Sequence, residues 1–310
     1  MKVCVFGGSG FLGGHVADAA SDAGHAVTIF DIRPSPYLRD DQKMEVGDIL
    51  DEKSLTKAIR GCDVVYHFAG VADIDEAKDK PVETVKYNIL GTTILLNCCV
   101  REKVKRFMFA SSVYVYSKAG SFYRSSKQAC ELLIENFYDR FGLGYTVLRY
   151  GSLYGPRADA HNGLYRLLEQ AMRMKKIIFH GSGEEIREFI HVQDAARLSI
   201  ETLKPRYKNE YVILTGHQPM KMKDLFEMIN EMMGHKVKIM YNNNISDVHY
   251  NITPYVFNPH LGKKLVGNLY IDMGQGVLQC LSDIHAASRR KHHRDVSVTR
   301  TATRRRKEKR

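Results

Sequence analysis

The sequence lacks several features that would assign it to a special class of protein. No apolar run approaches the roughly 20 residues of a membrane-spanning helix. The apolar stretch at the N-terminus is too short for a secretory signal and turns directly into glycines, in MKVCVFGGSG. The cysteines lie in apolar segments without metal-site spacing: Cys4, Cys62, Cys98, Cys99, Cys130 and Cys280. We therefore expect a cytoplasmic protein with reduced thiols, no membrane span and no bound metal.

Most of the chain also lacks a net charge of either sign. Residues 289–310 contain 11 of the 46 Lys and Arg and 2 of the 35 Asp and Glu, so they carry +9 of the net charge of +11. This tail has no aromatic residue and no apolar period, which predicts disorder. Its charge could bind a polyanion weakly by releasing counterions. The alternative is a solvated extension without a partner.

Apolar runs and helical patterns alternate through the first half of the chain. The runs typical of buried strands are 2–6, 25–31, 63–70, 105–112 and 144–155, and the helical patterns are 11–24, 51–62, 81–103 and 125–142. This alternation predicts βαβ units with right-handed crossovers. The expected fold is an α/β, doubly wound parallel Rossmann sheet.

The regular alternation of strand and helix patterns becomes less clear after about residue 155. Helical patterns at 162–175, 192–203 and 222–233 alternate with short strands such as EYVILTG and KVKIMY. We expect a small C-terminal α/β substrate-binding cap. The predicted division is 1–155 for the Rossmann domain, 156–287 mostly for the cap with interleaved Rossmann elements, and 288–310 for the basic disordered tail.

A glycine-rich turn joins the first strand to the first helix. Gly7, Gly10 and Gly13 in VFGGSGFLGG permit a tight turn, approach of a pyrophosphate and close helix packing, and Phe11 and Leu12 open the helix. Asp31 ends the second strand 18 residues after Gly13. Its carboxylate would accept from a ribose diol and repel a 2′-phosphate, which predicts NAD rather than NADP. Arg33 nearby favours the opposite choice.

A second acidic position follows in GDIL, residues 47–50. Asp48 and the adjoining Ile49 are candidates for contact with the adenine. The alternative for Asp48 is a simple loop acid.

The segment SSVYVYSKAGSFYRSSK, residues 111–127, contains three groups suited to proton transfer. Tyr123 and Lys127 are i and i+4, so they share one face of a helix. A tyrosine with its ordinary pKa of about 10 is a poor base at neutral pH. We expect the lysine ammonium and a positive nicotinamide to lower that pKa, and Ser112 to orient the same substrate hydroxyl.

These motifs occur in one order along the chain, followed by LRYGSLYGPR (148–157) and REFIHVQDAARLSIETL (187–203). In these motifs and their order, residues 2–285 resemble the extended short-chain dehydrogenase/reductase superfamily, in particular the NAD-dependent epimerase/dehydratase family that acts on nucleotide sugars. The resemblance implies catalytic roles for Ser112, Tyr123 and Lys127, with the last two also at the cofactor. It adds Phe68, Ala69, Gly70, Asn88 and Tyr150 to the cofactor contacts, and Ser152 and Arg187 to the substrate contacts. It also implies a homodimer paired through helices at 82–99 and 125–140.

The chain departs from the family pattern around the substrate. The loop from Ser112 to Tyr123 is shorter than usual, Ser152 replaces an asparagine, and 241–262 contains no clear second phosphate-binding arginine. Val113 and Tyr114 stand where the family's 4,6-dehydratases have Asp-Glu, and where its decarboxylases have a glutamate. No obvious acid–base pair for eliminating water remains.

We therefore predict an NAD-dependent epimerase or oxidoreductase that acts on a nucleotide-activated sugar. Tyr123 is the expected general acid/base, with hydride transfer to and from NAD. The alternative is a non-catalytic NAD(P)-binding regulatory or scaffold protein of the same fold. We expect His67 to be a packed strand-end residue and Arg149 to have a structural partner.

Overall fold

The computed structural model describes residues 1–242, 249, 251 and 252. The basic segment 289–310 and the end of the expected cap lie outside the described residues. All described residues fall within one compact unit, Met1–Asn258.

Seven parallel strands form the main sheet, in the order β10-β6-β5-β4-β1-β2-β3. The chain winds outward from β1 in both directions, which confirms the predicted doubly wound sheet. The strands are β1 (Lys2–Phe6), β2 (Ala26–Asp31), β3 (Gln42–Val46), β4 (Val64–His67), β5 (Arg106–Ser112), β6 (Tyr145–Tyr150) and β10 (Glu210–Leu214).

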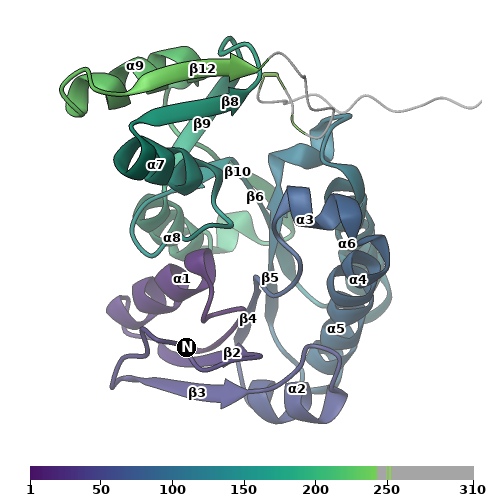
Figure 1. The fold of residues 1–310 in the computed structure, drawn as a ribbon. Coiled ribbons are helices and arrows are strands. Elements are labelled where there is room, and N and C mark those ends of the chain that lie inside the picture. The colour runs from purple at the N-terminus through teal and green to yellow at the C-terminus, as the bar shows by residue number, and fades with distance from the viewer. Residues whose placement is uncertain (243–248, 250, 253–310) are drawn as a thin grey trace, which may run out of the picture. The chain divides into compact units, whose positions relative to one another are not determined.

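Helices cover both faces of this sheet (Figure 1). One face packs against α1 (Phe11–Asp22) and α8 (Val192–Glu201). The other packs against α2 (Glu52–Ile59), α5 (Gly91–Arg101) and α6 (Ser121–Phe141). Strand β1 shows why both faces are covered. Val3 and Val5 belong to the core beneath α1 and α8, and Cys4 and Phe6 belong to the core beneath α2, α5 and α6. Because successive side chains point to opposite faces, the apolar run that follows Lys2 in this strand is buried on both faces of the sheet.

A smaller layer follows β6 in the chain. It contains a three-stranded sheet, β11-β9-β7, and a parallel pair, β12 and β8. Helices α7 and α9 pack on these strands around a separate core that includes Ile177 and Phe226. The elements are β7 (Ser152–Tyr154), α7 (Gly163–Met174), β8 (Lys176–His180), β9 (Ile186–His191), β11 (Pro219–Lys221), α9 (Met222–Met232) and β12 (Lys238–Asn242).

Several boundaries differ from the predicted ones. The edge strand β3 was not predicted, since only one of its residues, Gln42, is buried. The predicted helix at 81–103 consists of α4 (Pro81–Thr84), a π-helical turn η1 (Val85–Leu90) and α5. The predicted strand at 63–70 ends at His67, and its last residues form a loop before α3 (Ile74–Asp79).

None of the described helices combines the length and the apolar character that a membrane span requires. The five cysteines in this part of the chain are free: Cys4, Cys62, Cys98, Cys99 and Cys130.

A buried ion pair joins β6 to α6. Arg149 Nη2 lies 2.6 Å from Glu131 Oε2, and the side chains are only 14% and 9% exposed. Ser111 Oγ donates to Glu131 at 2.6 Å, and the guanidinium lies 4.4 Å from the Tyr211 ring centre. The expected structural role of Arg149 is confirmed. Such a pair holds the helix against the strand, and losing one partner leaves the other charge buried.

We predict that Arg149→Leu lowers the free energy of unfolding by about 3 kcal/mol, because Glu131 keeps a buried charge without its cation. Urea denaturation measures this. The control is Arg173→Leu, whose pair with Glu169 is exposed and should cost less than about 0.5 kcal/mol. Equal losses in the two variants would contradict the assignment.

Candidate functional site

Two glycines of the turn after β1 leave no room for a side chain. Gly7 has φ +76°, and a Cβ there would lie 2.6 Å from the Ala69 backbone nitrogen. A Cβ on Gly13 would lie 2.2 Å from the Gly7 carbonyl oxygen. These contacts bring the start of α1 onto the turn, where backbone N–H groups and the helix N-terminus favour an anion. The turn therefore fits the pyrophosphate of a dinucleotide.

Asp31 lies beside this turn, at the end of β2. Its Oδ2 accepts from the Ser9 backbone N–H at 3.0 Å, and Oδ1 accepts from the Arg33 N–H at 3.4 Å. These contacts hold the carboxylate beside the glycine turn. Asp48 instead accepts from the Leu50 N–H at 2.9 Å, and Ile49 is buried.

The loop after β4 is held by Asn88 in the π-helical turn. The Asn88 amide donates to the Val71 carbonyl at 3.0 Å and accepts from the Val71 N–H at 2.7 Å. Gly70 makes room for this contact, because a Cβ there would lie 2.5 Å from Asn88 Oδ1. The same amide donates to Ser126 on α6 at 2.9 Å. In the structure, Asn88 thus positions the loop that contains Ala69 and Gly70.

Ser112, Tyr123 and Lys127 are brought together at the end of β5. Helix α6 begins at Ser121, four residues earlier than predicted, which places Tyr123 in its first turn and Lys127 one turn later. Lys127 Nζ donates to the Ala110 carbonyl at 2.8 Å and lies 5.5 Å from the Tyr123 ring centre. The predicted triplet therefore forms one cluster, in which Ser112 and Lys127 are buried and Tyr123 is partly buried.

The pKa values of this cluster are governed by burial. Burial raises the pKa of Tyr123 to about 12, opposed by a hydrogen bond with Ser112. In the protein alone the lysine ammonium therefore does not offset desolvation, and the predicted lowering of this pKa would need the positive nicotinamide as well. Burial also lowers the pKa of Lys127 to about 8. His67 is packed as expected, and burial lowers its pKa to about 3.

Tyr150 also lies near this cluster, on the neighbouring strand. Its hydroxyl bonds Ser199 Oγ on α8 at 2.6 Å, and its ring lies 6.4 Å from that of Phe68. The Tyr150 hydroxyl is therefore held away from the cluster, and its ring is the part placed beside Phe68.

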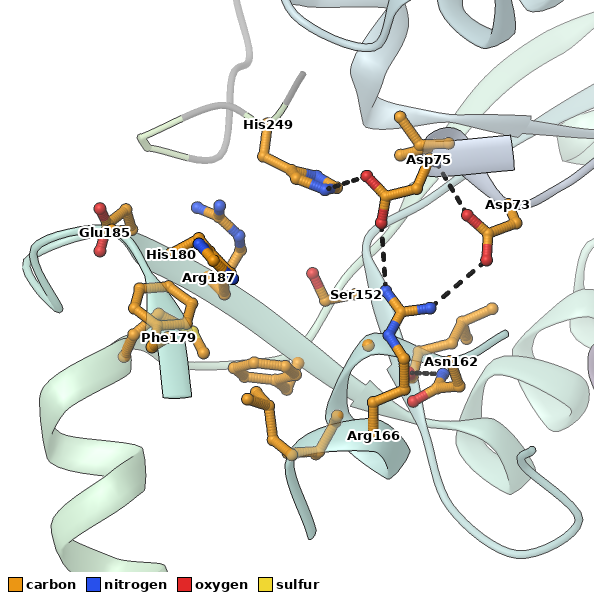
Figure 2. Close-up of a pocket in the computed structure, with 18 of the residues that line it drawn as sticks. Asp73, Asp75, Ser152, Asn162, Arg166, Phe179, His180, Glu185, Arg187 and His249 are labelled. Atoms are coloured by element: carbon orange, nitrogen blue, oxygen red, sulfur yellow. Dashed lines mark hydrogen bonds and ion pairs between the residues drawn. The ribbon is translucent and has the colours of Figure 1, made fainter. Parts of the chain in front are cut away.

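A cavity of about 600 Å³ opens from this cluster toward the smaller layer. Its lining includes Ser112 and Tyr123 at one end, and the predicted substrate residues Ser152 and Arg187. Figure 2 shows Arg187 and Ser152 from the smaller layer facing the same space as Asp73 and Asp75. The fold thus brings the predicted catalytic and substrate residues to one cavity.

An ionic group that the sequence did not predict also lines this cavity. Arg166 on α7 contacts Asp73 Oδ2 at 3.4 Å and Asp75 Oδ2 at 3.3 Å (Figure 2). Asp73 also caps α3, accepting from the Asp75 N–H at 2.8 Å. The only signal in the sequence was a D-x-D cap before a short helix, which is also typical of an ordinary N-cap.

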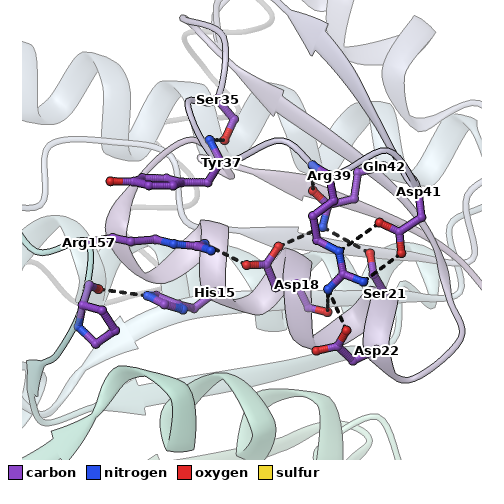
Figure 3. Close-up of polar contacts among 11 residues, drawn as sticks. His15, Asp18, Ser21, Asp22, Ser35, Tyr37, Arg39, Asp41, Gln42 and Arg157 are labelled. Atoms are coloured by element: carbon purple, nitrogen blue, oxygen red, sulfur yellow. Dashed lines mark hydrogen bonds and ion pairs between the residues drawn. The ribbon is translucent and has the colours of Figure 1, made fainter.

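The segment after β7 is anchored on the cofactor side of the molecule. Arg157 Nη1 lies 2.7 Å from Asp18 Oδ2 on α1, and its guanidinium stacks 4.3 Å from the Tyr37 ring centre (Figure 3). His15 Nε2 bonds the Pro156 carbonyl oxygen at 2.9 Å. The chain that leads from β7 toward α7 is therefore fastened to the helix that follows the glycine turn.

A family model described as the NAD dependent epimerase/dehydratase family matches residues 3–213. The chain belongs to this family. The match spans the glycine turn, the Ser112–Tyr123–Lys127 cluster and most of the cavity lining.

Individual family members are similar along most of their length. The UDP-N-acetyl-alpha-D-glucosaminuronate decarboxylase of Bacillus cytotoxicus is 26% identical over 268 residues, which cover 77% of this chain and 83% of that protein. The structure of a Thermotoga maritima UDP-glucose 4-epimerase with UDP-glucose is 26% identical, with a TM-score of 0.75, covering 83% and 90% of the two chains. The structure of MoeE5 with UDP-glucose and NAD is 25% identical, with a TM-score of 0.72, covering 78% and 85%.

We predict that Lys127→Met is more stable than the natural protein at pH 7 by about 3 kcal/mol, because it removes a buried charge. The Lys127 pKa falls from 10.5 to about 8 on folding. The penalty is therefore fully present below pH 8 and disappears as pH rises through 10.5.

Urea denaturation of both proteins between pH 7 and 11 measures this difference. The control is Lys53→Met on the exposed start of α2, which should change little at any pH. A stability difference that does not shrink over this range would show that Lys127 is not a desolvated cation.

Proposed function

We propose that this family member is an NAD-dependent epimerase or oxidoreductase that acts on a nucleotide-activated sugar, with Tyr123 as general acid/base. One observation carries the proposal: Ser112 and Tyr123 line the same cavity as Ser152 and Arg187. The relatives that are named or solved with UDP-sugars support a nucleotide sugar as the occupant. The complete Ser-Tyr-Lys cluster favours catalysis over a binding or scaffold role.

The cofactor would be held by the turn of Gly7, Gly10 and Gly13, and by Asp31. NAD⁺ supplies a hydride acceptor and a positive charge when bound. Because Tyr123 has a pKa of about 12 in the protein alone, it needs a nearby positive charge to act as a base near neutral pH. Lys127, held by the Ala110 carbonyl, supplies one such charge when protonated.

The substrate would be oriented by the groups that line the cavity. Ser112 Oγ, which accepts from the Tyr114 N–H at 3.3 Å, would share the sugar hydroxyl with Tyr123. Tyr123 would take the proton of this hydroxyl and return it at the end of the reaction. Arg187 would meet the diphosphate, and Ser152 would contact the substrate nearby. We also propose that residues 156–287 act mainly as the substrate-binding cap.

We predict that Asp31→Ala removes the preference for NAD⁺ over NADP⁺. In the natural protein the fixed carboxylate accepts from a ribose diol and repels a 2′-phosphate, so NAD⁺ should bind at least about tenfold tighter. Isothermal titration with both dinucleotides measures this. Equal affinities in the natural protein would refute the role of Asp31.

We predict that Tyr123→Phe lowers turnover by at least about 100-fold, as expected for loss of a general acid/base, while NAD⁺ affinity and thermal stability change little. The assay incubates the protein with a panel of nucleotide sugars, with and without NAD⁺, and follows products by mass spectrometry and NMR. The control is Tyr138→Phe on the exposed part of α6. Turnover within a few-fold of the natural protein would place the base elsewhere.

We further propose a homodimer that pairs through α4, the π-helical turn and α6. These helices contact one another and expose apolar side chains, including Val82 at 74% and Leu132 at 62%. Exposed apolar side chains on neighbouring helices are a feature of interaction sites.

Light scattering at micromolar concentration should give twice the chain mass of 35.3 kDa. Leu132→Glu should shift the mass to that of the monomer, because it places a charge in the apolar interface. Leu198→Glu on α8, where Leu198 is also exposed, should not. A monomeric natural protein would exclude the proposed interface.

A further inference from the structure

A second group of ionisable side chains faces the cavity beside Tyr123. The Tyr114 hydroxyl lies 2.8 Å from His249 Nδ1, and His249 Nε2 lies 3.5 Å from Asp75 Oδ1. Tyr114, His249 and Asp75 all line the cavity. Figure 2 shows the His249 ring directly beside the Asp75 carboxylate, with their contact drawn as a dashed line. None of the functions proposed above uses this chain of contacts.

The fold holds Tyr114 firmly next to the expected catalytic tyrosine. It lies in the 3₁₀ turn η2 (Val113–Tyr116), directly after Ser112 and Val113, and it is 9% exposed. Its ring packs edge-on against the Tyr123 ring, with centres 6.4 Å apart. Gly120, with φ +97°, leaves room for the ring, since a Cβ there would lie 2.7 Å from Tyr114 Cδ1.

The contacts of His249 define its tautomer. With the carboxylate of Asp75 at Nε2, a neutral imidazole carries its proton on Nε2 and accepts from the Tyr114 hydroxyl at Nδ1. Burial is the main cause that lowers the His249 pKa, Arg187 and Arg166 lower it further, and Asp75 raises it. The imidazole is therefore neutral at pH 7 and able to take the Tyr114 proton. The same hydroxyl–imidazole–carboxylate logic activates nucleophiles elsewhere.

We propose that Tyr114 is a second acid/base group of the sugar site, with His249 and Asp75 as its positioning residues, and that it exchanges a proton on a carbon next to C4 of a 4-keto nucleotide sugar. The proposal rests on the proposed function, because it needs a nucleotide sugar in the cavity. It assigns an acid/base group to the position where sequence analysis found none.

The step is balanced without any redox partner. His249 Nδ1 takes the Tyr114 hydroxyl proton, and the Tyr114 phenolate oxygen takes the proton of the C–H bond. The electron pair of that bond moves into the C4 carbonyl as an enolate. Return of a proton to the carbon restores the ketone. The His249 side chain is 38% exposed, so the imidazolium releases its proton to solvent, accepts the carbon-derived proton from the Tyr114 hydroxyl, and releases that proton too. A solvent proton then returns to Tyr114 by the same route and is passed to the carbon, which acquires a solvent hydrogen.

The neighbouring position separates this chemistry from elimination of water. Val113 is fully buried and has no proton to give to a departing hydroxyl. The site therefore has a group to remove the proton but not the adjoining acid of the dehydratase pattern. The expected chemistry is proton exchange at a carbon beside the ketone.

The test uses UDP-4-keto-6-deoxyglucose in D₂O with the full-length protein and NAD⁺. NMR follows deuterium at C3 and C5, against a sample without protein. We expect exchange in the natural protein, and a loss of at least about 100-fold in Tyr114→Phe, as for removal of a general base. His249→Gln should also lose exchange. In the natural protein the exchange rate should rise with pH in the range below about 6.5, as the histidine loses its proton, and the variant should lack this rise.

Tyr138→Phe and His217→Gln, on exposed positions outside the cavity, are the matched controls and should keep the natural rate. Exchange no faster than without protein, or equal rates in Tyr114→Phe and the natural protein, would overturn the proposal. Since this probe is already a ketone, exchange does not depend on oxidation of a sugar hydroxyl. Exchange on this ketone, together with no product from any nucleotide sugar of the panel, would sink the proposed redox function and leave this inference standing.

Discussion

A buried lysine ammonium at the end of β5 is the interaction on which the proposed chemistry depends. Lys127 is 8% exposed, and its polar contact is the Ala110 carbonyl at 2.8 Å, with the Phe109 ring centre 4.9 Å away. A fall in pKa from 10.5 to about 8 corresponds to a cost of about 3 kcal/mol for keeping the charge. A structural role alone would not require a cation here. Its position one helical turn from Tyr123 places the charge where it would stabilise a Tyr123 phenolate.

The polar groups around the cavity are arranged in two connected sets. Tyr123 and Lys127 lie toward the glycine turn, where a dinucleotide fits. Tyr114 leads in the other direction, through His249 and Asp75, to Arg166 on α7. The second set therefore connects the main sheet to the smaller layer, and a sugar between them would contact groups from both.

The predictable parts were those set by local pattern. The alternation of strand and helix patterns predicted the parallel sheet, and the i, i+4 spacing predicted that Tyr123 and Lys127 share one face of α6. The edge strand β3 escaped because most of it is not buried, and α6 starts earlier because Gly120 adopts a positive φ. The contacts of His249 with Tyr114 and Asp75 span 135 and 174 residues of sequence, so no local pattern reports them. The direction of the Tyr123 pKa depended on burial, which spacing does not reveal.

The most direct test of the account is a crystal structure of the protein with NAD⁺ and UDP-glucose. We expect the sugar 4-hydroxyl within about 3 Å of both Tyr123 and Ser112, as a proton transfer requires, and the diphosphate at Arg187. A sugar ring bound in the cavity but out of reach of Tyr123 would contradict the central claim that this tyrosine moves the proton.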